Sequence, residues 1–381
     1  MSGENYLKKL LNGADVKWTA LGAVADIGTG SSNRQDGSEN GIYPFFVRSK
    51  NILKSDTFEF DETAIVIPGE GGIGDIYHYV EGKYSLHQRA YRIRVAANVV
   101  NAKYLYYFMS SSFKQYILMK SVGATAISIR KPMLEDFQIP IPCPENPKKS
   151  LEIQGEIVRI LDAFTELTTE LTTELTARKK QYNHYRDQLL SFEDDEVQWT
   201  ALGALAENLD SMRKPITSGL REPGDIPYYG ASGIVDYVKD YIFDCDLLLV
   251  SEDGANLLAR NTPIAFSISG KSWVNNHAHV LKFKTYAERK YVEYYLNSID
   301  LMPYISGSAQ PKLNKKSLES IRIPNPSPED KKRIVEILDK FDALTGSISD
   351  GFPREIELRQ KQYEHYRDLL LSFSKSEALG A

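Results

Sequence analysis

Cysteine is scarce in this chain: of 381 residues only Cys143 and Cys245 are cysteines, and they lie in different halves of the sequence. Two thiols without Cys or His neighbours at ligand spacing exclude a disulfide framework and a cysteine-rich zinc site. No window approaches 18 consecutive apolar residues, and no basic region followed by an apolar stretch begins the chain. The sequence therefore predicts neither a membrane span nor export, and the expected compartment is the reducing cytoplasm.

Catalytic signatures are also lacking. The sequence has no Asn/Asp-Pro-Pro-aromatic tetrad, which methylation of base amino groups would need. The glycine-rich run 69–74 is followed by strand-like residues and not by Lys-Ser/Thr, so it predicts a hairpin turn rather than a phosphate-binding loop. His277 and His279 share one face of an expected strand, but no third ligand is evident, which favours a packed or base-contacting pair over a metal site. The sequence predicts no catalytic residue and no metal.

Charge of one sign is not concentrated in the way expected of a strong DNA-binding protein. Residues 16–142 hold 14 Lys+Arg against 12 Asp+Glu, and residues 197–326 hold 14 against 14. The excess of acidic residues lies in the segments that are expected to be helical. Residues 143–196 hold 7 Lys+Arg against 12 Asp+Glu, and residues 327–381 hold 9 Lys+Arg against 11 Asp+Glu. Any DNA contact would therefore depend on local basic clusters rather than on a broad basic field, and the charge pattern alone favours an ordinary solvated surface.

The sequence does contain an internal repeat. Residues 16–23 return as residues 197–204 with one substitution, and residues 180–187 return as residues 361–368, both at an offset of 181 positions. Two separated motifs at one offset indicate two versions of one module. The sequences between the motifs have diverged, which favours a common scaffold carrying two different binding surfaces over neutral drift of two ordinary domains.

The repeated scaffold has the apolar spacing of long helices. Its central part predicts one helix roughly 55 to 60 Å long, and the tandem Thr-Thr-Glu-Leu units at 168–171 and 172–175 would each add about 6 Å. That tandem is either a length adjuster or an accident without consequence. Gly351 and Pro353 interrupt the C-terminal copy, which predicts two helices there. The stripe residues expected to pack along these helices are Ile157, Ile160, Phe164, Leu167, Leu171, Leu175, Tyr182, Tyr185, Ile334, Ile337, Phe341, Leu344, Tyr363 and Tyr366.

The two diverged segments each predict short strands followed by an aromatic helix and an Ile-Pro turn, at Ile139 and Ile323. The expected strands are 43–47, 64–68, 75–79 and 89–95 in the first segment, and 226–229, 247–251, 264–267 and 279–283 in the second. The expected helices cover 102–120 and the residues around Tyr291 to Leu296. Tyr6 and Leu10 precede the first scaffold motif as Tyr185 and Leu189 precede the second, so the two ends of the chain are expected to meet.

The expected fold is therefore α+β, with two mixed α/β domains separated by long antiparallel coiled-coil helices, pseudo-two-fold symmetry and circularly arranged repeats. The expected segments are an N-terminal tail completing the distal scaffold (1–15), a first domain (16–142), a central helical spacer (143–196), a second domain (197–326) and a C-terminal helical region (327–381).

These motifs resemble those of a known family. Trp-x-x-Leu-Gly at 18–22 and 199–203, Ile-Val-x-Ile-Leu-Asp at 157–162 and 334–339, and Lys-Gln-Tyr-x-x-Tyr-Arg-Asp at 180–187 and 361–368 are similar to motifs of the specificity (S) subunits of type I restriction-modification enzymes. The Thr-Glu-Leu tetrads resemble the IC-like subfamily. The similarity covers nearly the whole chain and is strongest in the scaffold.

The resemblance implies a division of labour. Each diverged segment would be a target recognition domain that reads one half of a bipartite DNA site, while the helices set the gap between the halves and dock two methyltransferase (M) subunits. Two restriction (R) subunits would join for cleavage. The chain itself would carry no active site and no cofactor, since the M subunits bind S-adenosylmethionine and the R subunits use ATP and Mg.

Base contacts are expected mainly from amide, guanidinium and hydroxyl side chains in turns, because these groups can form paired hydrogen bonds with base edges. In the first domain the candidates are Arg48, Ser49, Lys50, Asn51, His87, Gln88, Arg89, Ser128, Arg130 and Lys131. In the second they are Tyr229, Ser232, Asn256, Asn275, Asn276, His277, Gln310 and Lys312. For each residue, a purely structural role in its loop is the competing interpretation.

Two other classes of function compete with this one. The first is a non-catalytic coiled-coil adaptor whose diverged domains bind protein or sugar ligands. The second is a self-contained nuclease or methyltransferase, which the missing catalytic motifs disfavour. A neighbouring gene product with an Asn-Pro-Pro-Tyr/Phe motif would favour the specificity-subunit interpretation over the adaptor.

Overall fold

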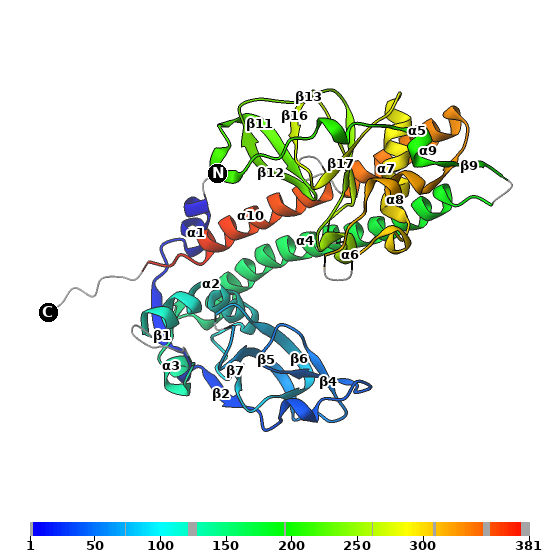
Figure 1. Cartoon of the computed structure of the whole chain (residues 1–381). Helices are drawn as coiled ribbons and strands as arrows, with labels where there is room; N and C mark the ends of the chain where they lie inside the picture. Colours follow the sequence, from blue (N-terminus) through cyan, green and yellow to red (C-terminus); the bar gives the residue numbers. More distant parts are fainter. Residues whose placement is uncertain are drawn as a thin grey trace. The chain divides into compact units, whose positions relative to one another are not determined.

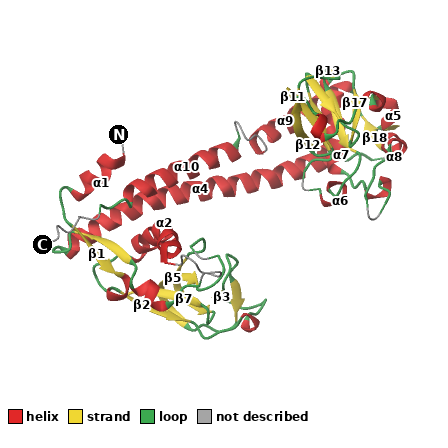
Figure 2. Cartoon of the chain, turned by 60° about the vertical axis from the view of Figure 1, so that its left-hand side comes forward, coloured by secondary structure: helices red, strands yellow, loops and turns green. Residues whose placement is uncertain are grey.

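The chain folds into two compact units that are each a mixture of helices and strands (Figure 2). The computed structural model describes residues 3–72, 74–120, 128–193, 196–260, 262–307, 310–345 and 351–374. One unit comprises Met1–Leu171 with Ile356–Ala381, and the other comprises Thr172–Glu355. The helix α4 (Pro147–Leu190) contributes residues to both units (Figure 1). The α+β class and the two-domain layout predicted from the sequence are confirmed.

The first unit is built on a six-stranded sheet in the order β2-β7-β5-β6-β3-β4, and β1 pairs separately with β8. The central strands pair antiparallel, whereas β3 runs parallel to β6. Isoleucines such as Ile65 and Ile93 face each other across β5 and β7 and are buried. The strands are β1 (Val16–Ala20), β2 (Ala25–Thr29), β3 (Tyr43–Phe46), β4 (Leu53–Ser55), β5 (Phe60–Pro68), β6 (His78–Leu86), β7 (Ala90–Val95) and β8 (Gln138–Pro142).

Helix α2 (Ala102–Lys120) supplies much of the core of this unit and has the bounds that the sequence predicted. Its apolar face, which includes Tyr104, Phe108 and Phe113, joins the core formed with Ile65 and Ile93. The shorter helices of the unit are α1 (Gly3–Leu11) and α3 (Lys131–Glu135). The core therefore lies between the sheet and the aromatic face of α2.

The second unit repeats the central part of this sheet. Its strands in the order β10-β17-β14-β15 correspond to β2-β7-β5-β6, and β9 pairs with β18 as β1 pairs with β8. A further sheet has the order β12-β11-β16-β13. The strands are β9 (Gln198–Ala201), β10 (Glu207–Asn208), β11 (Pro223–Gly230), β12 (Gly233–Val238), β13 (Phe243–Asp244), β14 (Leu247–Ser251), β15 (Ala265–Ile268), β16 (Lys271–Val274), β17 (Ala278–Lys282) and β18 (Arg322–Asn325). The helices are α5 (Leu202–Leu205), α6 (Asn256–Ala259), α7 (Tyr286–Ser298), α8 (Lys315–Ser320), α9 (Pro328–Thr345) and α10 (Phe352–Leu370), the last of which extends into the first unit.

Two details of the sequence prediction were wrong. The Ile-Pro pairs at Ile139 and Ile323 lie in strands β8 and β18 rather than in turns. The reason is that β8 pairs with β1, where Trp18 lies opposite Pro140, and β18 pairs with β9, where Trp199 lies opposite Pro324. Each of these two sheets has two strands, so each strand is an edge strand, where proline is tolerated. The strand expected at 75–79 begins only at His78, because Gly72 and Gly74 adopt positive φ angles in the preceding turn. The antiparallel pairing of β5 with β6 confirms the predicted hairpin, although Ile73 of the glycine-rich run lies outside the described residues.

The repeated Trp-Thr-Ala-Leu-Gly motif has the same structural role in both units. The backbone N–H of Leu21 donates to Phe137, and that of Leu202 donates to Ile321. A Cβ atom on Gly22 would lie 2.9 Å from Glu135 Cβ, and one on Gly203 would lie 3.0 Å from Glu319 Cβ. Glycine is therefore required where α3 and α8 approach the motif closely.

The described segments nearest the two ends of the chain, α1 and the residues that follow α10, meet in the first unit, as the sequence predicted. Leu7 of α1 and Leu370 at the end of α10 are both buried in its core, and the Phe373 ring packs edge-on against Tyr104. Trp18 Nε1 donates to the Ser374 carbonyl at 3.5 Å. In the second unit, the corresponding residues Leu189, Leu190 and Phe192 belong to the core without a break in the chain, which confirms the circular arrangement of the repeats.

The predicted helical stripe packs against two kinds of partner. Ile157 and Ile334 lie in the globular cores of the two units rather than between helices. Farther along, Phe164 of α4 stacks on Tyr366 of α10 at 5.2 Å, and Tyr185 of α4 stacks on Phe341 of α9 at 5.7 Å. The interruption predicted at Gly351 is confirmed, since α9 ends at Thr345 and α10 begins at Phe352. None of the helices among the described residues is long and apolar enough to cross a membrane.

A tyrosine–aspartate hydrogen bond joins each aromatic helix to its scaffold helix. Tyr107 of α2 donates to Asp162 of α4 at 2.5 Å, and Tyr294 of α7 donates to Asp339 of α9 at 2.6 Å. Burial raises the pKa of both phenols, and their bonds to the carboxylates raise it further. Both aspartates belong to the repeated Ile-Leu-Asp motif, so this motif fastens each domain to the scaffold.

Replacing Tyr294 with Phe should lower the free energy of unfolding by about 1.5 to 3 kcal/mol, the usual contribution of a hydrogen bond to a charged group. Urea unfolding of the full chain measures the change. Tyr286 provides the matched control, because it donates to the other oxygen of the same Asp339 carboxylate at 2.8 Å but is 54% exposed. Tyr286→Phe should cost well under half as much, and equal losses for the two variants would contradict the assignment.

Candidate nucleic-acid interface

An open groove lies in the second unit next to the end of β14. Its volume is about 860 Å³, and three of its lining residues are predicted base-contacting residues, His277, Gln310 and Lys312. Asp253 and Gly254, which follow β14, complete one wall. Lys312 is held in place by its backbone, which exchanges hydrogen bonds with Ser306 at 2.8 and 2.9 Å. The fold therefore brings together hydrogen-bonding side chains from three separate segments of the chain.

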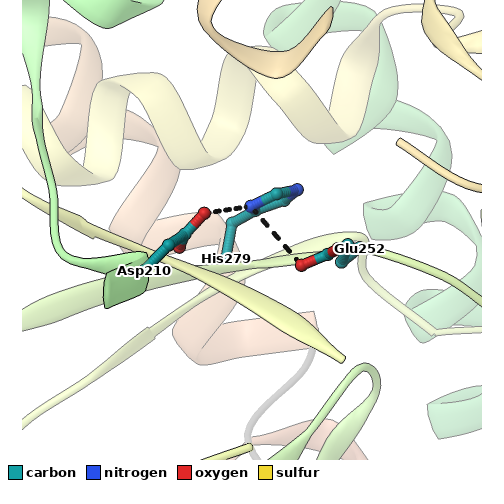
Figure 3. Close-up of side chains that lie close together, drawn as sticks. All are labelled: Asp210, Glu252 and His279. Atoms are coloured by element: carbon teal, nitrogen blue, oxygen red, sulfur yellow. Dashed lines mark hydrogen bonds and ion pairs between the residues drawn. The ribbon is translucent and has the colours of Figure 1, made fainter. Parts of the chain in front are cut away.

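A network of charged side chains lies directly behind Lys312. Lys312 Nζ is 3.1 Å from Glu252 Oε1, and Arg213 contacts the other Glu252 oxygen at 2.5 Å. His279 Nδ1 is 2.6 Å from Asp210 Oδ2 and 3.8 Å from Glu252 Oε2 (Figure 3). The side chains of Asp210, Glu252 and His279 are all at least 89% buried. Because these charges are paired with one another, the network makes a rigid base for the groove.

Both ring nitrogens of His279 are hydrogen-bonded. Its Nε2 atom is 2.7 Å from the Leu313 carbonyl oxygen, and its Nδ1 atom faces the Asp210 carboxylate, so both ring nitrogens face acceptors. Burial raises the pKa of Asp210, but the hydrogen bond and charge of His279 outweigh burial and hold that pKa below its usual value. The His279 ring therefore joins the Asp210 carboxylate to the backbone of Leu313 and holds both in place.

The same three residues have the spacing of a metal site. Ligand atoms of Asp210, Glu252 and His279 lie within 4.8 Å of one another, a grouping that sequence spacing did not reveal. Arg213 and Lys312 already balance these carboxylates, however, and His279 donates to one of them. The donor set therefore fits a charge network better than a cation site. His277 does not join this cluster, because its ring lies 2.9 Å from Asp253.

In the first unit, the Glu70 carboxylate binds two of the arginines that were predicted to contact bases. Glu70 Oε2 accepts hydrogen bonds from Arg48 at 3.0 Å and from Arg89 at 3.1 Å. The Arg89 guanidinium, with help from Arg48, holds the pKa of Glu70 below its usual value. The backbone of Glu70 also bridges to Ser128, a third predicted residue. Arg48, Arg89 and Ser128 thus meet at one turn, whose centre is a residue that the sequence analysis did not select.

Comparison with known proteins decides what this architecture is. The model of the type I restriction modification DNA specificity domain matches residues 14–179 and again residues 195–358. The chain belongs to this family. The EcoR124I/EcoR124II specificity subunit of Escherichia coli is 34% identical over the whole of both chains. The EcoprrI specificity subunit, also of Escherichia coli, is 33% identical over 92% of this chain and 93% of its own.

Solved structures support the same fold for the specificity domains. The S subunit of the type I restriction-modification system of M. genitalium superposes with a TM-score of 0.65 at 16% identity, covering 96% of this chain and 98% of that one. A chain from a type I R-M system superposes with a TM-score of 0.57 at 13% identity, covering 93% and 97%.

The other predicted residues of the first specificity domain divide into exposed and structural groups. Lys50, Asn51, Gln88, Arg130 and Lys131 are exposed. His87 is buried, and its Nδ1 accepts the backbone N–H of Arg89 at 3.0 Å. The Ser49 hydroxyl donates to the Asn51 carbonyl at 3.0 Å, so it shapes its own bend. His87 and Ser49 thus position neighbouring backbone, and base contact by any residue of this set stays a prediction.

The same division holds in the second specificity domain. Ser232 and Asn276 are exposed. Asn275 is buried and its side chain accepts the His277 backbone N–H at 2.8 Å, while Asn256 exchanges hydrogen bonds of 3.0 Å with the backbone of Thr262. Tyr229 is half-buried and packs against Phe266. Asn275, Asn256 and Tyr229 therefore hold the loops that present their exposed neighbours.

Glu70 and Asp253 were not predicted from the sequence, because base contacts were expected from amide, guanidinium and hydroxyl groups and not from carboxylates. A signal was present, since an acidic residue followed by glycine comes after an apolar strand in both domains, as Glu70-Gly71 and Asp253-Gly254. Both glycines adopt positive φ angles, 70° and 104°. An acid–glycine turn at matching places in two diverged domains would have identified both residues.

Proposed function

We propose that this chain is the DNA-specificity subunit of a type I restriction-modification complex. Each specificity domain reads one half of a bipartite site in double-stranded DNA, and the helical scaffold sets the gap between the halves. The observation that carries this proposal is the pairing of one repeated backbone frame with two different sets of exposed polar side chains. Arg48, Glu70 and Arg89 form one set, and Asp253, His277 and Lys312 form the other.

The catalytic work belongs to partner subunits in this proposal. Two methyltransferase (M) subunits dock on the scaffold helices, bind S-adenosylmethionine and methylate adenine, while two restriction (R) subunits use ATP and Mg for cleavage. This chain binds no cofactor and catalyses no step. The exposed scaffold residues Tyr185 and Leu344 are candidates for the docking surface, since they are 40% and 47% exposed.

Bivalent binding explains how two domains of nearly neutral charge can select a DNA site. Joining two weak readers raises the effective concentration of the second once the first is bound. Phosphate contacts dominate salt-dependent affinity, and the M subunits would supply most of them. The isolated chain should therefore bind DNA poorly, and its affinity should rise sharply in the complex with M.

Co-expression with the neighbouring M subunit tests the proposal, with methylated adenines mapped in host DNA by single-molecule sequencing. The expected result is one split motif with a fixed gap that disappears when this chain is omitted. Methylation that is equal without this chain, or absent despite a stable complex with M, would overturn the proposal and favour an adaptor that binds other ligands.

Gln310 provides a local test of the groove. Its side chain is exposed at the groove, and a base-edge hydrogen bond contributes about 1 to 3 kcal/mol of discrimination. Gln310→Ala should therefore relax one position of one half-site by about 10- to 100-fold. Gln115→Ala, on the exposed side of α2 in the other domain, should leave the motif intact. An unchanged motif for Gln310→Ala would remove this loop from the interface.

A further inference from the structure

A carboxylate occupies the same structural position in both specificity domains. Glu70 lies two residues after β5, and Asp253 lies two residues after β14. The neighbouring strands have matching registers, with Ile67 opposite Tyr91 in the first domain and Val250 opposite His279 in the second.

The hydrogen bonds around the two carboxylates also match one by one. In the first domain Gly69 N donates to Arg89 O, and Ile129 N donates to Gly69 O, both at 2.9 Å. In the second, Glu252 N donates to His277 O at 2.9 Å, and Leu313 N donates to Glu252 O at 2.8 Å.

Two further features complete the match. Glu70 bridges to Ser128 as Asp253 bridges to Lys312. Tyr91 donates to the carbonyl of Ile129, and His279 donates to that of Leu313. The same backbone hydrogen bonds therefore hold both turns in place, although the side chains that complete the arrangement differ.

The equivalent positions place a basic side chain beside each carboxylate. Arg89 corresponds to His277, and each pairs with its acid, at 3.1 Å for Glu70 and 2.9 Å for Asp253. The pairs are open to solvent, since the side chains of Glu70 and Asp253 are 43% and 33% exposed and those of Arg89 and His277 are 57% and 51% exposed. Such exposed pairs contribute little to stability, so stability does not explain why both domains have one.

We propose that Glu70 and Asp253 are equivalent specificity-determining residues, each accepting a hydrogen bond from the exocyclic amino group of a base in the half-site that its own domain reads. The inference rests on the proposed function. In this arrangement the acid selects an amino-bearing base edge, such as N4 of cytosine, while its basic partner donates to the neighbouring acceptors of guanine.

The chemistry of DNA favours this role over a non-specific one. Phosphates repel a carboxylate, so an acid at a DNA-facing turn is unfavourable unless basic side chains or a base amino group donate to it. A carboxylate has about four acceptor positions, and at Glu70 both arginines use one oxygen, Oε2. Glu70 has two basic partners, Arg89 and Arg48, whereas Asp253 pairs with His277. This difference makes the two turns read different base patterns on the same backbone arrangement.

The test replaces each acid by its amide of equal size in the complex with M and maps the methylated motif. Glu70→Gln should lower the preference for an amino-bearing base by about 10- to 100-fold at one position of one half-site, and Asp253→Asn should do so in the other half-site only. Glu70→Asp, which keeps the carboxylate, should retain the base preference. Glu222→Gln removes the acid of an exposed ion pair with Lys239 elsewhere in the second domain and should leave both half-sites unchanged.

The outcomes separate this inference from the proposed function. If the wild-type chain directs no split motif, the proposed function is wrong, and the inference that rests on it is wrong as well. If the wild type directs a motif and both amide variants keep it unaltered, or only lower the extent of methylation at every base, the inference alone is overturned. Thermal unfolding of each variant identifies a purely structural effect, which would lower the melting temperature without changing base preference.

Discussion

Inserting one more Thr-Thr-Glu-Leu unit after Leu175 is expected to widen the gap of the methylated DNA site while both half-site sequences stay unchanged. Four residues lengthen a helix by about 6 Å, and one base pair of DNA rises about 3.4 Å, so the gap should grow by about one to two base pairs. Because α4 is one continuous helix of 44 residues, added length cannot be absorbed in a loop. Motif mapping in the complex with M measures the gap.

The control for this prediction is an insertion that changes the helical phase. Four residues turn the helix by about 400°, so the apolar stripe returns almost to its own face, whereas two residues turn it by about 200°. A two-alanine insertion at the same place should prevent Phe164 and Tyr182 of α4 from facing their partners Tyr366 and Phe341 at the same time, and should abolish methylation. A gap that is unaltered by the tetrad would show that α4 does not set it.

Replacing Asp210 with Asn should lower the free energy of unfolding by about 3 to 5 kcal/mol, as expected when one partner of a buried ion pair is removed. The variant removes the charge that the Arg213 side chain meets at 3.5 Å and weakens acceptance from the Val280 N–H, which now lies 2.8 Å from Asp210 Oδ1. Urea unfolding followed by the fluorescence of Trp199 and Trp273 in the same unit measures the loss. A loss below about 1 kcal/mol, the value of a surface pair, would contradict the structure of the network.

The pH dependence of this variant follows from the lowered pKa of Asp210. A carboxyl group whose folded pKa is depressed contributes its full stabilisation above its unfolded pKa and loses it as the pH falls through the folded value. The difference in unfolding free energy between wild type and Asp210→Asn should therefore narrow in acid, as the pH falls below the ordinary range of an aspartate. Asp236→Asn is the matched control, because Asp236 pairs with Arg221 at 2.9 Å while its side chain remains 43% exposed.

Local pattern was sufficient to predict much of the fold. The helix 102–120 was predicted to the residue because its aromatic residues recur at helical spacing as far as Tyr116. The break before α10 was predicted because glycine and proline act through the backbone alone. The strands near Ile139 and Ile323 were missed because their prolines suggest turns, and only their pairing with the tryptophan strands makes them strands.

The candidate interface was predicted less completely. His277, Gln310 and Lys312 do line one groove, but His87 and Asn275 proved to be buried, because a polar residue in a turn can bond to its own loop as readily as it faces solvent. Asp210, Glu252 and His279 form a cluster although up to 69 positions separate them. Their meeting depends on the order of β10, β17 and β14 in the sheet.

The sequence by itself determined the duplicated frame and its helices, because repeats, periodicity and backbone preference are properties of neighbouring residues. Only the tertiary structure decided which acidic side chain pairs with which basic side chain. Glu70 lies 19 positions from Arg89 and 22 from Arg48, and Asp253 lies 24 from His277. Strand register, set by the burial of the opposite faces, places these partners side by side, and register is a property of the whole sheet rather than of any one segment.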